Sequence, residues 1–177
     1  MIYDPAEDSF LLAKWVKRYA KGKTVLDIGT GSGILAQTAH DVGATYVLAV
    51  DITEEAVNAV RKQGIEVIQS DICHNITESF DLIICNPPYL PHDDEEDEES
   101  AVITTGGKEG YEFIERFLKE ARSHLHYNGS ILLVCSSLSG DVEKLFTHYQ
   151  YVFTKIDEEK CFFEKLYVYH LTIDNVI

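Results

Sequence analysis

The sequence has few basic residues, no clustered cysteines and no long apolar run. No stretch of about 18 apolar residues and no basic-then-apolar leader occurs, so we expect neither a membrane span nor a secretory signal, and predict a cytoplasmic protein. The four cysteines, at positions 73, 85, 135 and 161, follow no CxxC or Cys/His spacing. We therefore expect reduced, mostly buried thiols and no metal site.

Basic residues number only 15 against 30 acidic ones, which gives a formal net charge of −15. Such a chain does not attract phosphates over long range, so the balance weighs against a nucleic-acid substrate unless a local basic cleft or a basic partner intervenes. One acidic run, Asp93 to Glu99, lies in a segment that we predict to be a loop over residues 92–107. Its simplest interpretation is a solvated loop, and docking of a basic partner is the alternative.

Apolar material is sufficient for a single domain over residues 1–177, because 45% of the residues are hydrophobic. Near-continuous apolar strands alternate with helices, which predicts an α/β fold with a mostly parallel sheet covered on both faces. The last two strand-like segments have no helix between them and should form an antiparallel hairpin. We predict an N-terminal helical segment over 1–22, strands over 24–29, 45–52, 65–71, 80–86 and 130–137, helices over 53–63, 110–125 and 139–149, and hairpin strands over 151–160 and 161–171.

A glycine-rich turn, LDIGTGSG, ends the first predicted strand. Gly29, Gly31 and Gly33 allow a ligand to lie against the backbone at the start of the next helix. Asp51 and Asp71 end the two following strands, where a carboxylate can accept hydrogen bonds from ribose hydroxyls. Taken singly, each feature is explained equally well as a turn or a helix cap. Together they favour an adenosine-type ligand at the carboxyl edge of the sheet.

The segment NPPY follows the apolar strand FDLIIC, and its prolines must end the strand pairing. The side-chain oxygen of Asn86 and the backbone carbonyl of Pro87 can converge as two acceptors for a planar NH2 group. Two acceptors that hold both hydrogens favour a pyramidal nitrogen with a free lone pair, which can attack an electrophilic methyl group. Tyr89 adds an aromatic face. Without the glycine turn and the aspartates, NPPY could be a strand stop alone.

These motifs resemble those of known methyltransferases. Asp27 with the glycine turn resembles the first motif of the seven-stranded, Rossmann-like S-adenosyl-L-methionine-dependent methyltransferases, and NPPY resembles the [N/D]PP[Y/F/W] motif of the enzymes that methylate amino groups. The opening YDPAEDSFLL resembles that of the HemK2/Mtq2 branch, which methylates the glutamine of the GGQ motif in class 1 release factors. The resemblance implies a cofactor site made of Ser9, Asp27, Gly29, Gly31, Gly33, Asp51, Ile52, Asp71, Ile72 and Asn86, and catalytic roles for Asn86, Pro87 and Tyr89.

The same resemblance implies partners and leaves alternatives. It implies a class 1 release factor as the protein that is methylated in translation termination, and a small zinc-binding activator that covers the edge strand 65–71 through Ile65, Val67 and Ile68. Methylation of an exocyclic amine in RNA or DNA is the alternative activity. A domain that binds the cofactor without catalysis is a third reading, although an intact NPPY counts against it.

Overall fold

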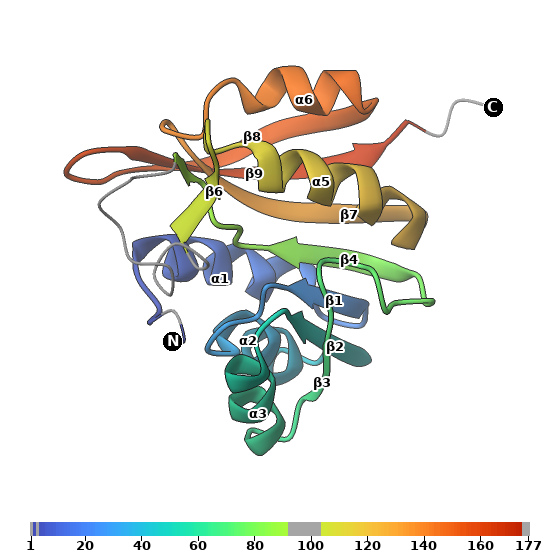
Figure 1. Cartoon of the computed structure of the whole chain (residues 1–177). Coiled ribbons are helices and arrows are strands. Elements are labelled where there is room, and N and C mark those ends of the chain that lie inside the picture. Colours follow the sequence, from blue (N-terminus) through green and yellow to red (C-terminus); the bar gives the residue numbers. More distant parts are fainter. Residues whose placement is uncertain (1, 3, 92–103, 175–177) are drawn as a thin grey trace.

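A sheet of seven strands runs through the molecule, with helices on both faces (Figure 1). The computed structural model describes residues 2, 4–91 and 104–174. The strand order is β3-β2-β1-β4-β7-β9-β8, and the first five strands are parallel to one another while β9 is antiparallel to β7 and β8. The strands are β1 (Thr24–Ile28), β2 (Tyr46–Asp51), β3 (Glu66–Gln69), β4 (Phe80–Cys85), β7 (Leu125–Ser136), β8 (Tyr151–Lys160) and β9 (Lys165–Ile173).

The helices form two layers, because each amphipathic helix buries its apolar side against one face of the sheet. On one face, three helices and the sheet side chains that face them form one hydrophobic core cluster. On the opposite face, the other helices described below form a second cluster with the sheet. The first layer contains α1 (Glu7–Tyr19), α2 (Ile34–Asp41) and α3 (Glu54–Lys62). The second contains α5 (Glu112–Ala121), the short 3-10 helix η1 (Arg122–His124) and α6 (Val142–His148).

The central strands β1 and β4 are buried on both sides, as their unbroken apolar sequences predict. The predicted parallel sheet, the helices on both faces and the antiparallel hairpin β8–β9 are confirmed. The predicted edge position of strand 65–71 is also confirmed, since β3 ends the sheet. Three of the four cysteines are buried and all four are free thiols, as predicted. In the described part of the chain, no helix is long and apolar enough to cross a membrane.

Several boundaries differ from the prediction. The YNG turn does not precede β7 but lies inside it, where the register jumps from Phe80↔Leu125 to Leu82↔Ser130 and Asn128 has a positive φ of 65°. The predicted helix 110–125 ends as an α-helix at Ala121. The predicted loop 92–107 ends earlier, because residues 105–107 form a strand. The acidic run Asp93 to Glu99 lies outside the described residues.

A second, two-stranded sheet was not predicted from the sequence. It pairs β5 (Leu90–Pro91) with β6 (Thr105–Gly107), so the segment that follows NPPY is held against the start of α5. A Cβ atom at Gly106 would overlap with the carbonyl oxygen of Gly110 and would also come within 2.8 Å of the carbonyl oxygen of Pro88. A side chain at this position would therefore push β6 away from both segments, which explains why a glycine stands there.

Candidate active site

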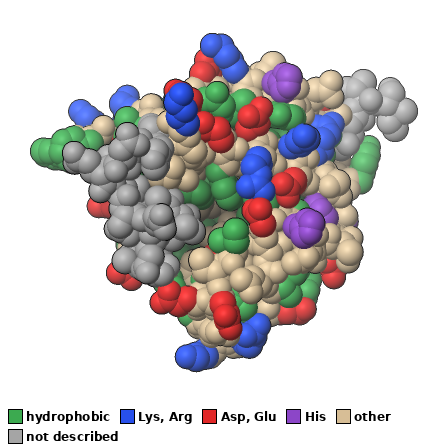
Figure 2. All heavy atoms as spheres, in the orientation of Figure 1, with side chains coloured by type: hydrophobic (Ala, Val, Ile, Leu, Met, Phe, Trp, Pro, Cys, Tyr) green, Lys and Arg blue, Asp and Glu red, His purple; other side chains and the backbone are tan. Residues whose placement is uncertain are grey.

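A cavity of about 440 Å³ opens at the carboxyl ends of β1, β2 and β4. In the sheet, β1 lies between β2 and β4, so the chain connections from β1 and toward β4 run in opposite directions. Open α/β sheets bind their ligands in the crevice that forms at such a point. Helices α1 and α5, from opposite faces of the sheet, contribute residues to its walls. On the face shown in Figure 2, hydrophobic side chains gather in a hollow near the centre.

The glycine turn forms one wall, but its three glycines have different surroundings. Gly29 and Gly31 line the cavity, and a Cβ atom at Gly29 would meet nothing within 4 Å. Gly33 does not line the cavity. It stands at the start of α2 with φ +85°, where a Cβ atom would come within 2.7 Å of the Gln63 side chain and 3.0 Å of Val60 on α3. Gly33 therefore permits the close packing of α2 on α3.

Asp27 lies beneath the turn rather than in the cavity wall, and its side chain is fully buried. One carboxylate oxygen accepts hydrogen bonds from the Thr30 hydroxyl at 2.7 Å and the Ala36 amide at 3.1 Å, which ties the turn to α2. Burial raises the pKa of Asp27 to about 7 even though these two hydrogen bonds act to lower it. Asp27 thus shapes the turn from below.

Asp51 and Ile52 form the next part of the wall, at the end of β2. The Asp51 carboxylate accepts the Gly31 amide at 2.9 Å and, with its other oxygen, the amide and hydroxyl of Thr53 at 2.9 and 2.8 Å. It therefore fixes the glycine turn and the start of α3 at once, and three of its roughly four acceptor sites are occupied within the chain. Ile52 follows and is 54% exposed beside the cavity. An apolar side chain in that position suits a flat, apolar ligand surface.

Asp71 and Ile72 line the cavity after β3. Asp71 forms an ion pair with Arg116 of α5, with 2.8 Å between the carboxylate oxygen and a guanidinium nitrogen, and both side chains are about half exposed. Ile72 is buried and has φ 49°, a conformation that β-branched residues rarely adopt. Such backbone strain costs about 1–2 kcal/mol and is often found where a chain shapes a binding site.

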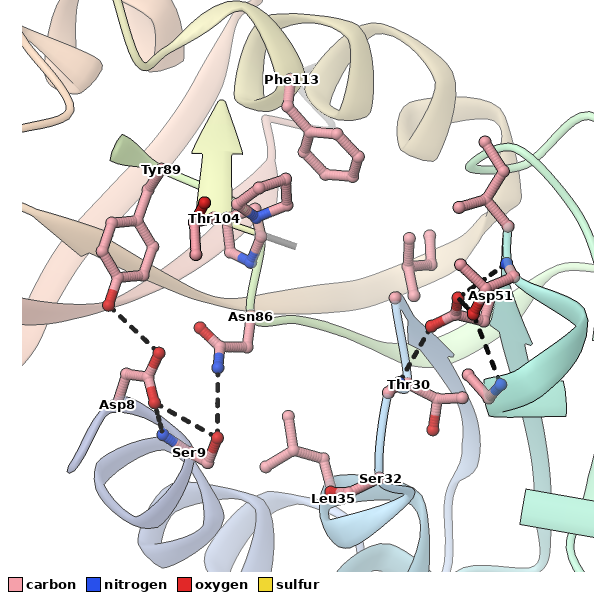
Figure 3. Close-up of a pocket in the computed structure, with 18 of the residues that line it drawn as sticks. Asp8, Ser9, Thr30, Ser32, Leu35, Asp51, Asn86, Tyr89, Thr104 and Phe113 are labelled. Carbon is pink, nitrogen blue, oxygen red and sulfur yellow. Dashed lines mark hydrogen bonds between the residues drawn. The ribbon is translucent and has the colours of Figure 1, made fainter. Parts of the chain in front are cut away.

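On the opposite wall, a chain of hydrogen bonds joins α1 to NPPY (Figure 3). The Asn86 side-chain amide donates to the Ser9 hydroxyl at 3.3 Å, and Ser9 donates through its own hydroxyl to Asp8 at 3.2 Å. Asp8 also accepts the Tyr89 hydroxyl at 3.1 Å and the Ser9 backbone amide at 2.5 Å. Asp8 and Ser9 are both buried. The structure thus brings four residues of α1 and NPPY into one network.

The other Asn86 side-chain atom, Oδ1, is buried and has no hydrogen-bond partner among the described residues. Leaving a buried acceptor unpaired costs about 1–3 kcal/mol, so such an atom at a cavity wall indicates a ligand that carries a donor. Pro87, which follows directly, also lines the cavity and has no N–H of its own. The hydrogen-bond acceptors and the apolar residues between the two walls fit a ligand with a nucleoside end and an amine-bearing partner.

Most of the residues singled out from the sequence meet in this cavity, and the exceptions are Asp27 and Gly33. Several wall residues were not identified from the sequence, because their positions depend on how helices and loops pack. They include Leu35, Thr104, Phe113, Arg116 and Glu164. In the part of the chain that is described, no group of three or more His, Cys, Asp or Glu side chains is placed to hold a metal ion.

A loop over residues 137–141 supports NPPY from behind, because the helix predicted from residue 139 starts only at Val142. The Ser139 hydroxyl donates to the Tyr89 carbonyl at 3.3 Å and accepts the Ser136 amide at 3.1 Å. The Ser136 hydroxyl in turn donates to Glu164, which lines the cavity from the β8–β9 hairpin. This loop therefore links the hairpin to the aromatic residue of the motif.

Comparisons with known proteins agree with this geometry. The family model described as methyltransferase small domain matches residues 4–162. A relative from Methanocaldococcus jannaschii, named "Putative protein N5-glutamine methyltransferase", is 36% identical over 152 residues, which cover 81% of this chain and 77% of that protein. The release factor glutamine methyltransferase of Lactococcus lactis is 35% identical over 123 residues, 62% of this chain and 46% of that protein. The present chain thus matches less than half of that longer bacterial protein.

Among solved structures, the E. cuniculi Mtq2-Trm112 complex, responsible for methylation of the eRF1 translation termination factor, has a similar fold. The TM-score is 0.80 at 24% identity, and the alignment covers 98% of this chain and 99% of the solved chain.

Proposed function

Since the chain belongs to the methyltransferase small domain family, we propose that it methylates a glutamine side-chain amide of a class 1 peptide chain release factor. When bound, S-adenosyl-L-methionine supplies an electrophilic methyl group to the site. Two relatives that are 35–36% identical are named glutamine methyltransferases, which supports an amide as the acceptor. We propose the cytoplasm, where translation terminates, as the location of a single domain spanning 1–177.

The orientation of the Asn86 amide is the observation that carries this proposal. A carboxylate can only accept hydrogen bonds, so the Ser9 hydroxyl gives its hydrogen to Asp8 and must accept from Asn86. The Asn86 NH2 group is thereby directed to Ser9, and Oδ1 is left as the unpaired acceptor at the cavity wall. The direction of these hydrogen bonds therefore determines that Oδ1 of Asn86, and not its NH2 group, faces the substrate.

With Oδ1 of Asn86 as one acceptor, the Pro87 carbonyl is the second acceptor that we assign. Together they would hold the two hydrogens of a substrate NH2 group, which orients its nitrogen and favours a lone pair available for attack. Among the described residues of the cavity wall, there is no His or Lys to act as a base. The scheme needs none, because the nitrogen can release its proton to water after the methyl group has been transferred.

The cofactor would lie along the glycine turn and the strand ends. We assign Gly29 and Gly31 to close backbone approach, Asp51 through its remaining acceptor site to the ribose, and Ile52 and Ile72 to the adenine faces. Asp71 would accept from the adenine amine, Ser9 would approach the methionine end, and Tyr89 would pack beside the methyl group. Asp27 and Gly33 support the turn without lining the cavity, so their contribution to cofactor binding would be indirect.

A direct assay tests the proposal. The chain is incubated with labelled S-adenosyl-L-methionine and either a class 1 release factor or total RNA and DNA, and the methylated residue is mapped by mass spectrometry. We expect label on the side-chain amide of the GGQ glutamine. Label in nucleic acid with none on the release factor would show that the alternative activity is the correct one. Asn86→Ala should abolish turnover while the cofactor still binds, and Asn86→Asp, which cannot present the same neutral NH2 to Ser9, should be nearly as inactive.

We also propose a small activator protein as a partner, with zinc bound to the partner rather than to this chain. The Mtq2 structure with a similar fold is a complex with Trm112. Strand β3 pairs only with β2 among the described strands, so its outer edge is available for pairing. Ile65 and Val67 are buried in this chain's own core, which leaves half-buried Ile68 as the apolar residue of the edge that a partner can cover. Hydrogen exchange of residues 66–69 with and without a co-expressed activator tests this contact.

A further inference from the structure

The tip of the β8–β9 hairpin exposes two adjacent phenylalanines. Phe162 is 91% exposed and Phe163 is 87% exposed, and their rings meet edge to face with centroids 4.6 Å apart. In Figure 2, hydrophobic side chains project at the far left, where Figure 1 places the end of this hairpin. Buried aromatic residues contribute strongly to interfaces, so two of them side by side in water indicate a contact surface. We name Phe162 and Phe163 the aromatic tip.

The aromatic tip is fixed to the candidate active site. The Cys161 amide donates to the Glu164 carbonyl at 2.9 Å and closes the turn, and Glu164 itself lines the cavity. The Ser137 amide donates to the Lys165 carbonyl at 2.8 Å, and the Lys165 amide donates to the Ser137 hydroxyl at 3.0 Å. The tip therefore belongs to the same hydrogen-bonded turn that supplies Glu164 to the cavity wall.

Acidic residues lie near Cys161, at the base of the tip. The pKa of the Cys161 thiol is raised first by burial and then by four nearby carboxylates, those of Glu159, Glu164, Glu7 and Asp8. Glu7 and Glu159 are exposed and Glu164 is half-buried, whereas Asp8 is buried and accepts hydrogen bonds from Tyr89 and Ser9. The three accessible carboxylates, those of Glu7, Glu159 and Glu164, which we name the charge collar, repel phosphates and attract lysine and arginine side chains.

The lysines of the hairpin do not cancel this charge. Lys155 and Lys165 both bind the carboxylate of Glu158, with nitrogen–oxygen distances of 3.1 and 3.2 Å. Lys160 adds one exposed positive charge beside the tip. Acidic groups still outnumber the basic ones, in keeping with the net charge of −15 for the chain.

We propose that the aromatic tip docks the protein substrate, by entering an apolar recess bordered by lysine or arginine side chains on that protein. The inference rests on the proposed function, because it takes the docked molecule to be the release factor that presents the amide. Docking at the tip would hold the substrate protein while one of its side chains enters the cavity, so the tip would matter for an intact protein and not for a short peptide.

Steady-state kinetics on two substrates test the proposal. The wild-type chain is compared with Phe162→Ser/Phe163→Ser on the intact release factor and on a short peptide that contains its GGQ motif. We expect kcat/KM to fall about 30-fold for the intact factor and less than about twofold for the peptide, the size expected when two anchor residues of an interface are lost. Tyr127→Ser is the matched control, since Tyr127 is 71% exposed at the opposite end of β7 and should leave both values unchanged.

Each other outcome has a definite meaning. Equal kcat/KM values for the double variant and the wild type on the intact factor would overturn the docking proposal and leave the proposed function standing. An equal loss on the peptide would show that the tip acts on the cavity, which also overturns docking. Loss of self-association by light scattering with unchanged turnover would assign the tip to a second copy of this chain. A wild-type chain that labels nucleic acid and neither protein substrate would overturn the proposed function, and docking with it.

The charge collar gives a second measurement that leaves the tip intact. Raising the salt concentration from about 50 to about 300 mM should lower kcat/KM for the intact factor several-fold, because the attraction between exposed charges is screened. Glu159→Gln should reduce this salt dependence and leave kcat/KM for the peptide unchanged. If the wild-type chain and Glu159→Gln respond equally to salt, the charge collar does not attract the substrate protein.

Discussion

Replacing glycines of the turn by alanine separates residues that face a ligand from residues that permit packing. Gly29 lines the cavity with φ +70°, and a Cβ atom added there would meet nothing within 4 Å, whereas one at Gly33, with φ +85°, would overlap with α3. Alanine in the left-handed region costs about 1–2 kcal/mol at either position. At Gly33 it would also displace the Gln63 side chain, whose amide donates to the Ser32 carbonyl at 2.8 Å, and that hydrogen bond is worth about 0.5–1.5 kcal/mol.

These free-energy costs predict a different loss of stability for each variant. Gly29→Ala should lose about 1.5 kcal/mol of unfolding free energy, and Gly33→Ala about 3 kcal/mol, which correspond to falls in Tm of roughly 5 and 9 °C for a chain of this size. Cofactor affinity should show the reverse order. The added methyl group at Gly29 enters the cavity and should weaken S-adenosyl-L-methionine binding at least about tenfold, whereas Gly33→Ala should change it less than about threefold.

Differential scanning calorimetry and titration calorimetry with the cofactor measure both quantities. Gly43→Ala is the matched control, since Gly43 also has a positive φ of 89° with nothing within 4 Å, and it does not line the cavity. It should resemble Gly29→Ala in Tm and the wild type in affinity. In a Gln63→Ala background the cost of Gly33→Ala should fall by about 1 kcal/mol. An unchanged cost in that background, or a larger loss of affinity for Gly33→Ala than for Gly29→Ala, would refute the assignment.

Three further variants test the remaining contacts. Ser9→Ala removes the acceptor of the Asn86 NH2 group, so kcat should fall about tenfold with a smaller change in cofactor affinity, and Ser9→Thr should retain most of the activity. Equal kinetics for the Ala and Thr variants would rule out the orienting role of the Ser9 hydroxyl. Asp51→Asn places an NH2 group where three donors now converge, so titration calorimetry should show cofactor affinity at least about tenfold weaker and scanning calorimetry a Tm lower by several degrees. The pKa of Asp27 is raised in the native state, so between about pH 4 and 7 the native state binds more protons than the unfolded state, and stability falls as the pH rises through this range. In urea unfolding, the wild-type chain should therefore have a lower unfolding free energy at about pH 8 than at about pH 5, and Asp27→Asn should reduce this difference.

The sequence was informative where local chemistry decides the structure. The apolar runs around Leu26 and Ile83 are buried on both faces, and that alone predicts central parallel strands. The prolines after Asn86 end β4 where the motif requires it, and the aspartates at the ends of β2 and β3 reach the same edge of the sheet because parallel strands end together.

Features that depend on distant packing were not accessible to such reasoning. Phe113 and Glu164 reach the cavity only because of the rotation of α5 against the sheet and the path of the hairpin. The contact between Gly33 and Gln63 joins the start of α2 to the end of α3. The sequence could not show this packing and suggested a ligand role for Gly33 instead. The bulge in β7 arises from its pairing with β4. The local sequence YNG indicates a turn whether it lies before the strand or within it.

Asp8 shows how burial decides between two readings of the same residue type. Acidic residues at the start of a helix are ordinarily explained by the partial positive charge of the helix N-terminus, and exposed Glu7 needs no other explanation. Asp8 lies one position further, is 3% exposed and meets Tyr89 as well as Ser9. A buried carboxylate is expensive unless its hydrogen bonds are satisfied, and here they are satisfied by groups whose orientation matters for the site. Because a carboxylate accepts and cannot donate in exchange, it sets the direction of the hydrogen bonds from Asn86 onward, which a neutral helix cap in its place would leave free to reverse.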